Sequence, residues 1–434
     1  MKSNFTILQV NSYDIAGGAE VIATNLFYGY LKRGYRSYLL VGMKKGSDPL
    51  IQEIEMGHSP NPWERYWMTK QGKYKRTKDM SKISWWKYYF TKFFAHPTDA
   101  LNLLSGIPDF NFPATRDITG LVPEPPDILH LHTLHGDYFD LRELPRISHE
   151  IPVVMTIHDT WITGQFYKNS PVPFPDSHIK KVYLKNYRQN AKILGGCQLH
   201  IITPSKWMMD LAGTSLLKPA IRNHEVIPNG IDLSVFHPYD KTKAREELGI
   251  SDTSKILVFS ANAIRQNVSK DYDTLHNALR IVADRQPDTN IVFYAIGESS
   301  SPERMGNAEI RFVPFFSNPQ TMAKYYQAAD IYIHAARVDN FPTTILESLA
   351  CGTPVVATAV GGIPEQVTDG FNGFLTKPAD PLDMADKIEL LLDNDTLRER
   401  MAQNAVKDAR ARFDMNVQIE RYLTFYQKIL VDTG

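Results

Sequence analysis

Two successive series of short apolar runs, separated by segments with helical spacing, constrain the fold of this chain most strongly. The first series is FTILQV (5–10), DILHLH (127–132), IPVVMTIH (151–158), LHIITPS (199–205) and HEVIPNG (224–230). The second is KILVFSA (255–261), NIVFYAIG (290–297), EIRFVPF (309–315), IYIHAA (331–336) and TPVVATAV (353–360). Strands that alternate with helices predict mainly parallel, doubly wound sheets. We therefore expect an α/β protein with two Rossmann-like domains.

The boundary between the two series is expected near Ile231–Asp240, after IPNGID and before a charged helical segment. This gives an N-terminal domain over residues 1–232 and a C-terminal domain over 233–415, and 434 residues suffice for both. The final segment, NVQIERYLTFYQKIL, has the spacing of an amphipathic helix. No apolar run reaches the roughly 18 residues that a membrane-spanning helix requires. The polar start MKSNFTILQVNSYD predicts a first strand rather than a signal peptide.

Only two cysteines are present, Cys197 and Cys351, far apart in the chain. Such sparse cysteines favour free thiols in a reducing, cytoplasmic compartment. The formal net charge is zero, but basic residues are in excess up to Val235 and acidic residues after it. This asymmetry indicates different partners for the two halves.

Residues 61–94 carry four of the six tryptophans (Trp63, Trp67, Trp85 and Trp86), with nine Lys and Arg against two acidic residues. Basic residues interleaved with large aromatic rings are typical of a segment that meets an anionic membrane surface. The alternative is a pair of helices that cover the first sheet and expose their lysines. Nucleic acid is disfavoured as a partner because no nucleic-acid-binding motif accompanies the patch.

The stretch DNFPTTILESLACGTPVVATAVGGIPE (339–365) places Asp339 and Glu347 eight positions apart around a predicted helix start. Pro342 suits the first turn of a helix. The backbone N–H groups of Thr343 and Thr344 then face outward at the positive end of the helix dipole, where phosphate binds readily. We expect Glu347 to reach hydroxyls of a nucleotide sugar and Asp339 to lie beside the transferred group.

Histidines follow two predicted N-terminal strands, at His130, His132, His135 and His158. Histidine is a common zinc ligand. However, no cysteine lies nearby and the spacing is not a helical H-x3-H, so we predict no metal site. No Ser-His-Asp set or other nucleophile is evident.

Gly17 and Gly18 follow the first strand in DIAGGAE (14–20). Because glycine lacks Cβ, such a loop lets backbone N–H groups approach a phosphate or an acceptor sugar. A plain tight turn is the alternative. The loop does not spell G-x-G-x-x-G, which disfavours a nicotinamide site.

The Asp339–Glu347 spacing resembles the E-x7-E signature of retaining family-4 glycosyltransferases of the GT-B fold, with Asp in place of the first Glu. The segments HLHTLHGDYF and HDTW resemble bacterial polysaccharide-assembly glycosyltransferases in particular. This resemblance implies two Rossmann-like domains that face each other across a cleft, the first binding the acceptor and the second the nucleotide-sugar donor. It also implies that the last helix, within 416–434, packs back on the first domain.

The resemblance also suggests roles for single residues. It implies that His158 contacts the transferred sugar. It also implies that His158, Asp339 and Glu347 are the catalytic residues. The donor-binding set that it implies is Gly17, Gly18, Arg265, Lys270, Phe315, Asn340, Phe341, Thr343, Thr344 and Glu347. The chain departs from the family pattern at Asn262, where an Arg is expected, and at Asp271, where a Gly is expected, so Arg265 is a substitute candidate.

The function that the resemblance implies is metal-independent, retaining transfer of a hexose from a UDP- or GDP-linked sugar to a glycan or lipid-linked acceptor. No cofactor is expected beyond this co-substrate. The expected location is the cytoplasm, with peripheral contact at the inner face of the cell membrane. Two alternatives stay open: a sugar-nucleotide epimerase of the same fold, and a non-catalytic GT-B protein that binds sugar nucleotides.

Overall fold

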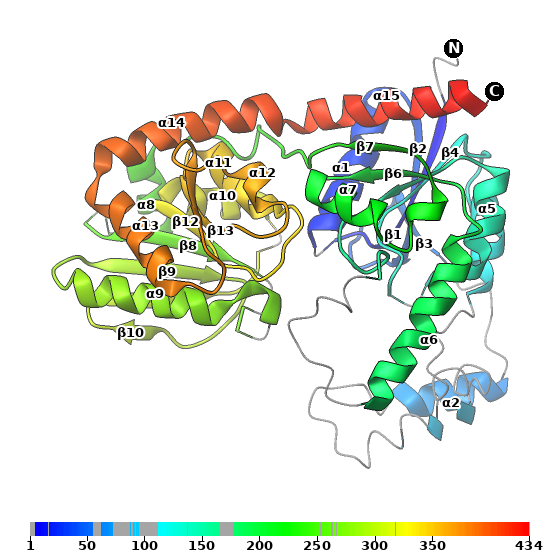
Figure 1. The fold of residues 1–434 in the computed structure, drawn as a ribbon, viewed down its shortest axis with the longest axis horizontal. Coiled ribbons are helices and arrows are strands. Elements are labelled where there is room, and N and C mark those ends of the chain that lie inside the picture. Colours follow the sequence, from blue (N-terminus) through cyan, green and yellow to red (C-terminus); the bar gives the residue numbers. More distant parts are fainter. Residues whose placement is uncertain are drawn as a thin grey trace. The chain divides into compact units, whose positions relative to one another are not determined.

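The computed structural model describes residues 5–15, 17–54, 62–72, 87, 90–91, 93–94, 112–136, 138–164, 177–251, 253–261, 264–265, 267–316 and 318–433. The chain forms two compact units. The N-terminal unit comprises Met1–Ile201, Leu211–His224 and Gln427–Gly434, and the C-terminal unit comprises Ile202–Asp210 and Glu225–Tyr426. Both are α/β units with a mainly parallel sheet (Figure 1).

The N-terminal unit is built on a seven-stranded sheet in the order β3-β2-β1-β4-β5-β6-β7. Its strands are β1 (Thr6–Tyr13), β2 (Arg36–Met43), β3 (Ile51–Glu53), β4 (Ile128–Leu131), β5 (Val153–Thr156), β6 (Leu199–Thr203) and β7 (Ile221–Val226). Its helices are α1 (Gly18–Lys32), α2 (Pro62–Gly72), α5 (Leu144–Glu150) and α6 (Ser177–Leu194), with 3-10 turns Pro113–Leu121, Leu141–Glu143 and Lys218–Ala220. Helix α7 (Lys206–Gly213) begins in the C-terminal unit and ends in the N-terminal unit. The chain winds outward from β1 through β2 and then restarts at β4, so the topological switch point lies between β1 and β4.

The C-terminal unit contains a second seven-stranded sheet in the order β10-β11-β9-β8-β12-β13-β14. Its strands are β8 (Lys255–Ser260), β9 (Ile291–Ile296), β10 (Glu303–Met305), β11 (Ala308–Val313), β12 (Ile331–His334), β13 (Val355–Thr358) and β14 (Gly373–Thr376). Only β10 pairs antiparallel among the strand pairs described in this sheet. Here the switch point lies between β8 and β12.

Several helices of the C-terminal unit begin at a capping side chain. Its helices are α8 (Lys241–Leu248), α9 (Tyr272–Arg285), α10 (Pro319–Ala328), α11 (Thr343–Cys351), α12 (Ile363–Gln366), α13 (Pro381–Asp393), α14 (Asp395–Arg412) and α15 (Met415–Thr433), with a 3-10 turn at Val268–Lys270. Asn318 accepts from the Gln320 N–H before α10, and Asp380 accepts from the Asp383 N–H before α13. Each of these two helices also starts with proline, which is favoured at the first helical position.

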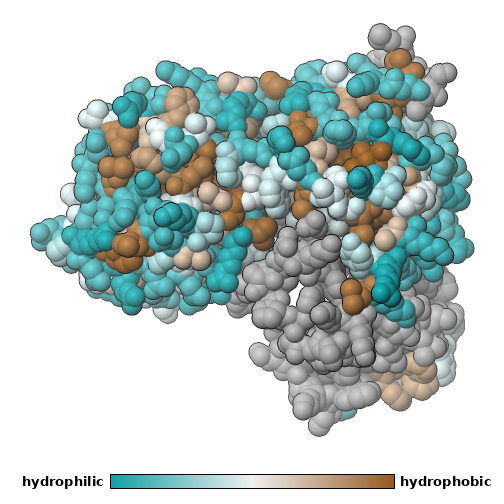
Figure 2. Space-filling model, in the orientation of Figure 1, coloured by the Kyte–Doolittle hydropathy of each residue, from teal (hydrophilic) through white to brown (hydrophobic). Residues whose placement is uncertain are grey.

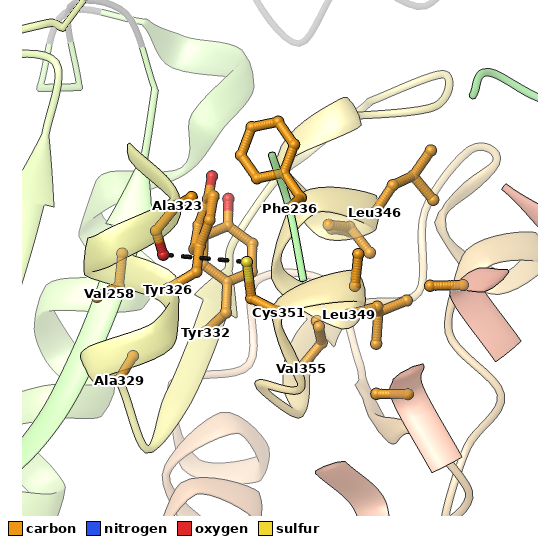
Figure 3. Close-up of a cluster of buried hydrophobic side chains, with 14 of the residues drawn as sticks. Phe236, Val258, Ala323, Tyr326, Ala329, Tyr332, Leu346, Leu349, Cys351 and Val355 are labelled. Carbon is orange, nitrogen blue, oxygen red and sulfur yellow. Dashed lines mark hydrogen bonds between the residues drawn. The ribbon is translucent and has the colours of Figure 1, made fainter. Parts of the chain in front are cut away.

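Buried side chains on both faces of the second sheet form its core. Ile331 and Ile333 of β12 contribute to one cluster, whereas Tyr332 contributes to the other, as expected for alternate residues of a strand. In the cluster that contains Tyr332, the ring of Tyr326 of α10 lies next to the Tyr332 ring, with centroids 5.5 Å apart (Figure 3). Buried residues of helix α11 belong to the same cluster.

The predicted strand and helix pattern is confirmed in both halves, with differences at the edges. The run 224–230 was expected to be a strand, but β7 spans Ile221–Val226. Pro228 lacks an N–H for sheet pairing, which explains why the strand stops before it. Strands β2, β3, β10 and β14 were not expected from the sequence. Two of them, β3 and β10, have only three residues each and lie at sheet edges.

The last helix, α15, belongs to the C-terminal unit up to Tyr426, and Gln427–Gly434 belong to the N-terminal unit. The long continuous stretch of the C-terminal unit begins at Glu225, a few residues before the expected boundary at Ile231–Asp240. Cys197 and Cys351 are both free, as predicted, and the structure shows that both are buried. None of the described helices is long and apolar enough to cross a membrane. Hydrophilic residues cover much of the face visible in Figure 2, and the brown patches between them are small.

Most of the aromatic and basic segment 61–94 lies outside the described residues. Within it, α2 carries Trp63 and Tyr66, whose exposed fractions are 58% and 52%. Trp67 stacks on Phe94 with ring centroids 4.9 Å apart, and the Trp63 Nε1–H donates to the Phe94 carbonyl. The segment therefore combines packed and exposed aromatic rings.

Candidate functional site

The site in the C-terminal unit lies where the chain leaves neighbouring parallel strands. Lys270 follows β8, Asp339 follows β12, and the glycine pair Gly361-Gly362 follows β13. Because β8, β12 and β13 are adjacent, these loops gather at one edge of the sheet, at the switch point. Ligands of open α/β sheets bind at such a place.

Gly361 and Gly362 lie in close contact with the backbone of the loop that carries Asp339. A Cβ on Gly361 would lie 1.8 Å from the Asp339 carbonyl oxygen, and a Cβ on Gly362 would lie 1.9 Å from the Asn340 carbonyl oxygen. Gly361 also has φ +56, a left-handed conformation that favours glycine. The Gly362 N–H donates to the Asp339 carbonyl at 3.2 Å. Only glycine permits this close contact, which holds the loop in place.

Asp339 is the centre of a polar cluster. Lys270 Nζ lies 2.5 Å and His334 Nε2 lies 3.2 Å from its Oδ2 atom. The Asp339 and Lys270 side chains are only 17% and 20% exposed. Burial alone would raise the pKa of Asp339, but the Lys270 charge and the His334 hydrogen bond hold it well below its usual range. Asp339 is therefore an ionised, oriented carboxylate.

Glu347, the second acid of the motif, has a different environment on helix α11. The Tyr326 hydroxyl donates to Glu347 Oε2 at 3.1 Å. Burial raises the pKa of Glu347 to about 7, although hydrogen bonds from Tyr326 and Thr343 oppose the shift. The two acids therefore differ in charge at neutral pH: Asp339 is ionised and Glu347 is close to half protonated.

Helix α11 begins at Thr343 with Pro342 as its N-cap and no capping side chain. The Ile345 N–H bonds the Pro342 carbonyl, whereas the N–H groups of Thr343 and Thr344 have no recorded partner among the described residues. This agrees with the expected open helix start, except that Pro342 precedes the first helical residue. Two N–H groups at a helix start can bind an anion.

The two predicted residues between Asp339 and the helix are buried. Asn340 Oδ1 accepts a hydrogen bond from the Ser205 hydroxyl at 2.7 Å. Phe341 lies in the hydrophobic core, edge-on to Phe413, and its carbonyl accepts from Asn229. Their side chains support the loop, so a contact from Phe341 to a donor would have to come from its backbone.

Arg265 was expected to bind diphosphate, but its side chain lies between two carboxylates. It pairs with Glu298 at 2.6 Å and with Glu303 at 3.4 Å, and it covers the Phe312 ring at 4.7 Å. Its charge is therefore compensated within the protein. The side chain of Phe315, just after β11, is 63% exposed, so its ring is accessible to solvent. Asn262 lies outside the described residues.

Sequence reasoning missed Arg337 and His334, which both lie close to Asp339. Arg337 pairs with Asp271 at 3.2 Å, and its N–H donates to the Ser269 carbonyl. Asp271 stands where the resemblance implies glycine, and it keeps the left-handed backbone, with φ +38. In the sequence, His334 is a lone histidine in an apolar strand ahead of Asp339. Nothing in that local pattern indicates its contact with Asp339.

The N-terminal unit carries the second predicted cluster, at the β1–β4 switch point. His132 Nδ1 lies 3.0 Å from His158 Nε2, and His132 Nε2 lies 2.9 Å from Gln9 Oε1. Burial lowers the pKa of His158 to about 4, so its ring is neutral at pH 7. A pocket opens here, lined among others by His135, His158 and Trp161.

A second polar pair, His135 and Asp159, also lines this pocket. His135 Nε2 lies 2.9 Å from Asp159 Oδ2, and this hydrogen bond raises the pKa of His135.

Gly17 caps α1 in an extended conformation, and a Cβ there would lie 2.1 Å from the Glu20 carboxylate. Gly18 starts the helix with open space beside it. No group of His, Cys, Asp and Glu in the described ranges has the arrangement of a metal site.

The structure thus brings together Lys270, Asp339 and the start of α11 in the C-terminal unit, and it gathers His132, His158 and Asp159 in the N-terminal unit. Two known sequence families cover these regions. Residues 16–235, half of the chain, match Glycosyltransferase Family 4, and residues 240–408 match Glycosyl transferases group 1.

The chain belongs to glycosyltransferase family 4. A relative with 31% identity over 300 residues is the D-inositol 3-phosphate glycosyltransferase of Corynebacterium aurimucosum, with 65% of this chain and 68% of that protein covered. The N-acetyl-alpha-D-glucosaminyl L-malate synthase of Bacillus anthracis is 27% identical over 311 residues, 70% of this chain and 76% of that enzyme. For other relatives the chain spans about half their length, 44% for the D-inositol 3-phosphate glycosyltransferase of a Nocardioides species.

Solved structures show the same fold as this family 4 chain. HepE from Anabaena, solved with UDP and glucose, is 16% identical with a TM-score of 0.65, and 98% of this chain and 99% of HepE are covered. Sucrose-phosphate synthase from Thermosynechococcus elongatus is 15% identical with a TM-score of 0.63, over 98% of this chain and all of that one (100%). The expected GT-B fold of two Rossmann-like domains is therefore confirmed.

Proposed function

We propose that this family 4 chain is a retaining, metal-independent glycosyltransferase that moves a hexose from a nucleoside diphosphate sugar to a glycan or lipid-linked acceptor in polysaccharide assembly. One observation carries the proposal: the ionised Asp339, held by Lys270, lies just ahead of the open start of α11, which carries Glu347. A sugar diphosphate presents the complementary chemistry, with hydroxyls for the acids and negative charge for the helix start and the lysine.

The proposed reaction needs no protein nucleophile. The acceptor hydroxyl attacks the anomeric carbon from the face that the diphosphate leaves, so a new glycosidic bond forms as the bond to the diphosphate oxygen breaks. That oxygen takes the proton of the acceptor hydroxyl. Lys270 and the N–H groups of α11 stabilise the charge that develops on the leaving diphosphate, a task that metal ions perform in other enzymes.

A uridine donor is the first choice to test. HepE, which shares the fold, has been solved with UDP-glucose. In this chain, we assign Glu347 to hydroxyls of the nucleotide part and Asp339 to the transferred sugar. His158 in the N-terminal unit is assigned to the sugar as well, because a neutral imidazole can donate to or accept from a hydroxyl.

The acceptor is assigned to the N-terminal unit, at the cytoplasmic face of the membrane. Exposed Trp63 and Tyr66 on α2, with the basic residues of 61–94, support contact with an anionic lipid surface. A lipid-linked acceptor is presented at such a surface.

The test starts with thermal unfolding of the full chain in the presence of a panel of UDP- and GDP-sugars, because a bound ligand stabilises the folded state. Transfer is then measured with the stabilising donor and a panel of glycan and lipid-linked acceptors. Conversion of the donor to another sugar nucleotide without acceptor would instead indicate an epimerase. Binding without any conversion would favour the non-catalytic alternative.

A further inference from the structure

His334 ends strand β12, and its side chain is fully buried between two polar groups of the Asp339 cluster. Its Nε2 atom lies 3.2 Å from Asp339 Oδ2, and its Nδ1 atom lies 3.2 Å from the Tyr332 hydroxyl. The ring also packs edge-on against Phe259 of β8, with centroids 6.0 Å apart. Contacts on three sides hold the imidazole in one orientation.

These neighbours determine where the ring hydrogen lies. Burial lowers the pKa of His334, so the ring is neutral at pH 7. The ionised Asp339 carboxylate can only accept a hydrogen bond, so His334 Nε2 carries the hydrogen and donates it to Oδ2. The Nδ1 atom then has a lone pair and lies 3.2 Å from the Tyr332 hydroxyl.

Both recorded polar contacts of the Asp339 side chain reach the same oxygen. Lys270 Nζ and His334 Nε2 bind Oδ2, at 2.5 and 3.2 Å. Within the part of the chain that the structure describes, no partner is recorded for Oδ1. The carboxylate is thus oriented, with Oδ2 turned toward the protein and Oδ1 available to a ligand.

We propose that His334 is a positioning residue, which selects the Asp339 oxygen that faces the transferred sugar. The inference rests on the proposed function, because it assumes that Asp339 Oδ1 accepts from a sugar hydroxyl. The carboxylate torsion of aspartate has a broad energy profile. Lys270 alone leaves that torsion free, since a flexible ammonium can follow either oxygen as a point charge. A buried imidazole donor in one direction fixes it.

Tyr332 supports the same arrangement from the other side of the ring. Tyr332 and His334 are alternate residues of β12, so their side chains share one face of the sheet. The Tyr332 hydroxyl oxygen also lies 2.8 Å from Thr344 Oγ1, on the second residue of α11. Tyr332 therefore ties the orientation of His334 to the helix start, and its loss should weaken the same effect.

Tyr326 offers a matched control. It is also a buried tyrosine of this core, next to Tyr332 (Figure 3), but its hydroxyl donates to Glu347 instead. A Tyr→Phe change at either position removes one hydroxyl from the same core. The two changes should differ only in which acid, and so which part of the donor, they affect.

The experiment uses the full chain and four variants, His334→Leu, His334→Gln, Tyr332→Phe and Tyr326→Phe. Calorimetry measures the affinity for the free nucleoside diphosphate and for the sugar nucleotide that the wild type binds best among UDP-glucose, UDP-N-acetylglucosamine and GDP-mannose. The readout is the ratio of the two affinities, together with KM and kcat for transfer. Thermal unfolding confirms that each variant is folded.

His334→Leu should lower the affinity ratio about tenfold, as expected when one hydrogen bond to a charged group is lost, with nearly unchanged diphosphate affinity. His334→Gln should restore most of the ratio, because its amide N–H can donate to Asp339 Oδ2. Tyr332→Phe should lower the ratio by a smaller factor, about threefold. Tyr326→Phe should change the diphosphate affinity and leave the ratio in place.

The inference is overturned, with the proposed function intact, by one result in a wild type that transfers sugar. That result is a folded His334→Leu variant whose ratio of sugar-nucleotide to diphosphate affinity is unchanged, including the case where both affinities fall equally. If His334→Leu does not fold, Tyr332→Phe decides by the same ratio. A wild-type chain that binds no sugar nucleotide would overturn the proposed function itself, and with it this inference.

Discussion

The Lys270 ammonium lies 2.5 Å from the Asp339 carboxylate, although the two residues are 69 positions apart in the chain. They meet because β8 and β12 are neighbours in the sheet while β9 and β11 lie on the other side of β8. In this structure each residue is the counter-ion of the other. A diphosphate bound at the proposed site would replace the carboxylate as the partner of the lysine.

Lys270→Ala should cost about 1–3 kcal/mol of unfolding free energy, because it leaves the mostly buried Asp339 charge without its cation. The double variant Lys270→Ala/Asp339→Asn should recover part of that loss, which a double-mutant cycle in urea measures. Additive losses would indicate that the pair is not coupled.

The same pair predicts a pH dependence. The pKa of Asp339 is lowered in the folded state, so its stabilising effect is present above the unfolded value, about 3.9, and is lost as pH falls below it. The stability difference between wild type and Asp339→Asn should therefore be constant from pH 5 to 8 and shrink below about pH 4. A difference that stays constant to pH 2 would contradict the ion pair.

Glu347→Gln should bind nucleoside diphosphate with a weaker pH dependence than the wild type. The pKa of Glu347 is raised to about 7, so wild-type Glu347 ionises between pH 6 and 8 and then accepts from ligand hydroxyls more strongly. For stability the sign is opposite: because the folded state favours the protonated acid, Glu347 destabilises the fold as pH rises from about 4.3 through 7. Glu347→Gln should thus gain stability relative to wild type at pH 8. Calorimetry and urea unfolding at pH 5 and 8 check both effects.

Glu347→Ala should lower turnover by roughly 100-fold if the acid contributes to the charged transition state. Retention of half the wild-type rate would remove Glu347 from the site.

His158→Ala should impair transfer and leave diphosphate affinity nearly intact, because His158 belongs to the N-terminal unit, whereas the proposed nucleotide site belongs to the C-terminal unit. With its pKa lowered to about 4, His158 is neutral across pH 6–8, so it should add no pH dependence of its own in that range. A large loss of diphosphate affinity in His158→Ala would place the residue in a different role.

Binding to anionic liposomes should be weak, reversible and reduced by salt, since each lysine near such a surface contributes about 1 kcal/mol. The variant with Lys70, Lys73, Lys75, Arg76 and Lys78 changed to Glu should lose it. Of these five, only Lys70 lies within the described residues. Co-sedimentation with anionic and neutral vesicles is the measurement, and equal recovery with both would point to a soluble acceptor.

The sequence by itself determined the elements and the motif of this protein. Local periodicity was enough for most strands and several helices, because a buried strand or an amphipathic helix depends on neighbours within a few residues. The motif also indicated the open start of α11. Short edge strands such as β10 were missed because three residues carry almost no pattern.

Only the tertiary structure decided which charges meet. The loops after β8 and β12 are distant in sequence, so nothing local shows that Lys270 reaches Asp339 while Arg265 turns to Glu298. The role of His334 was hidden for the same reason. In the sequence it is one polar residue in an apolar strand, and its hydrogen bonds exist only once sheet order, strand register and side-chain rotamers bring Tyr332 and Asp339 to either side of its ring.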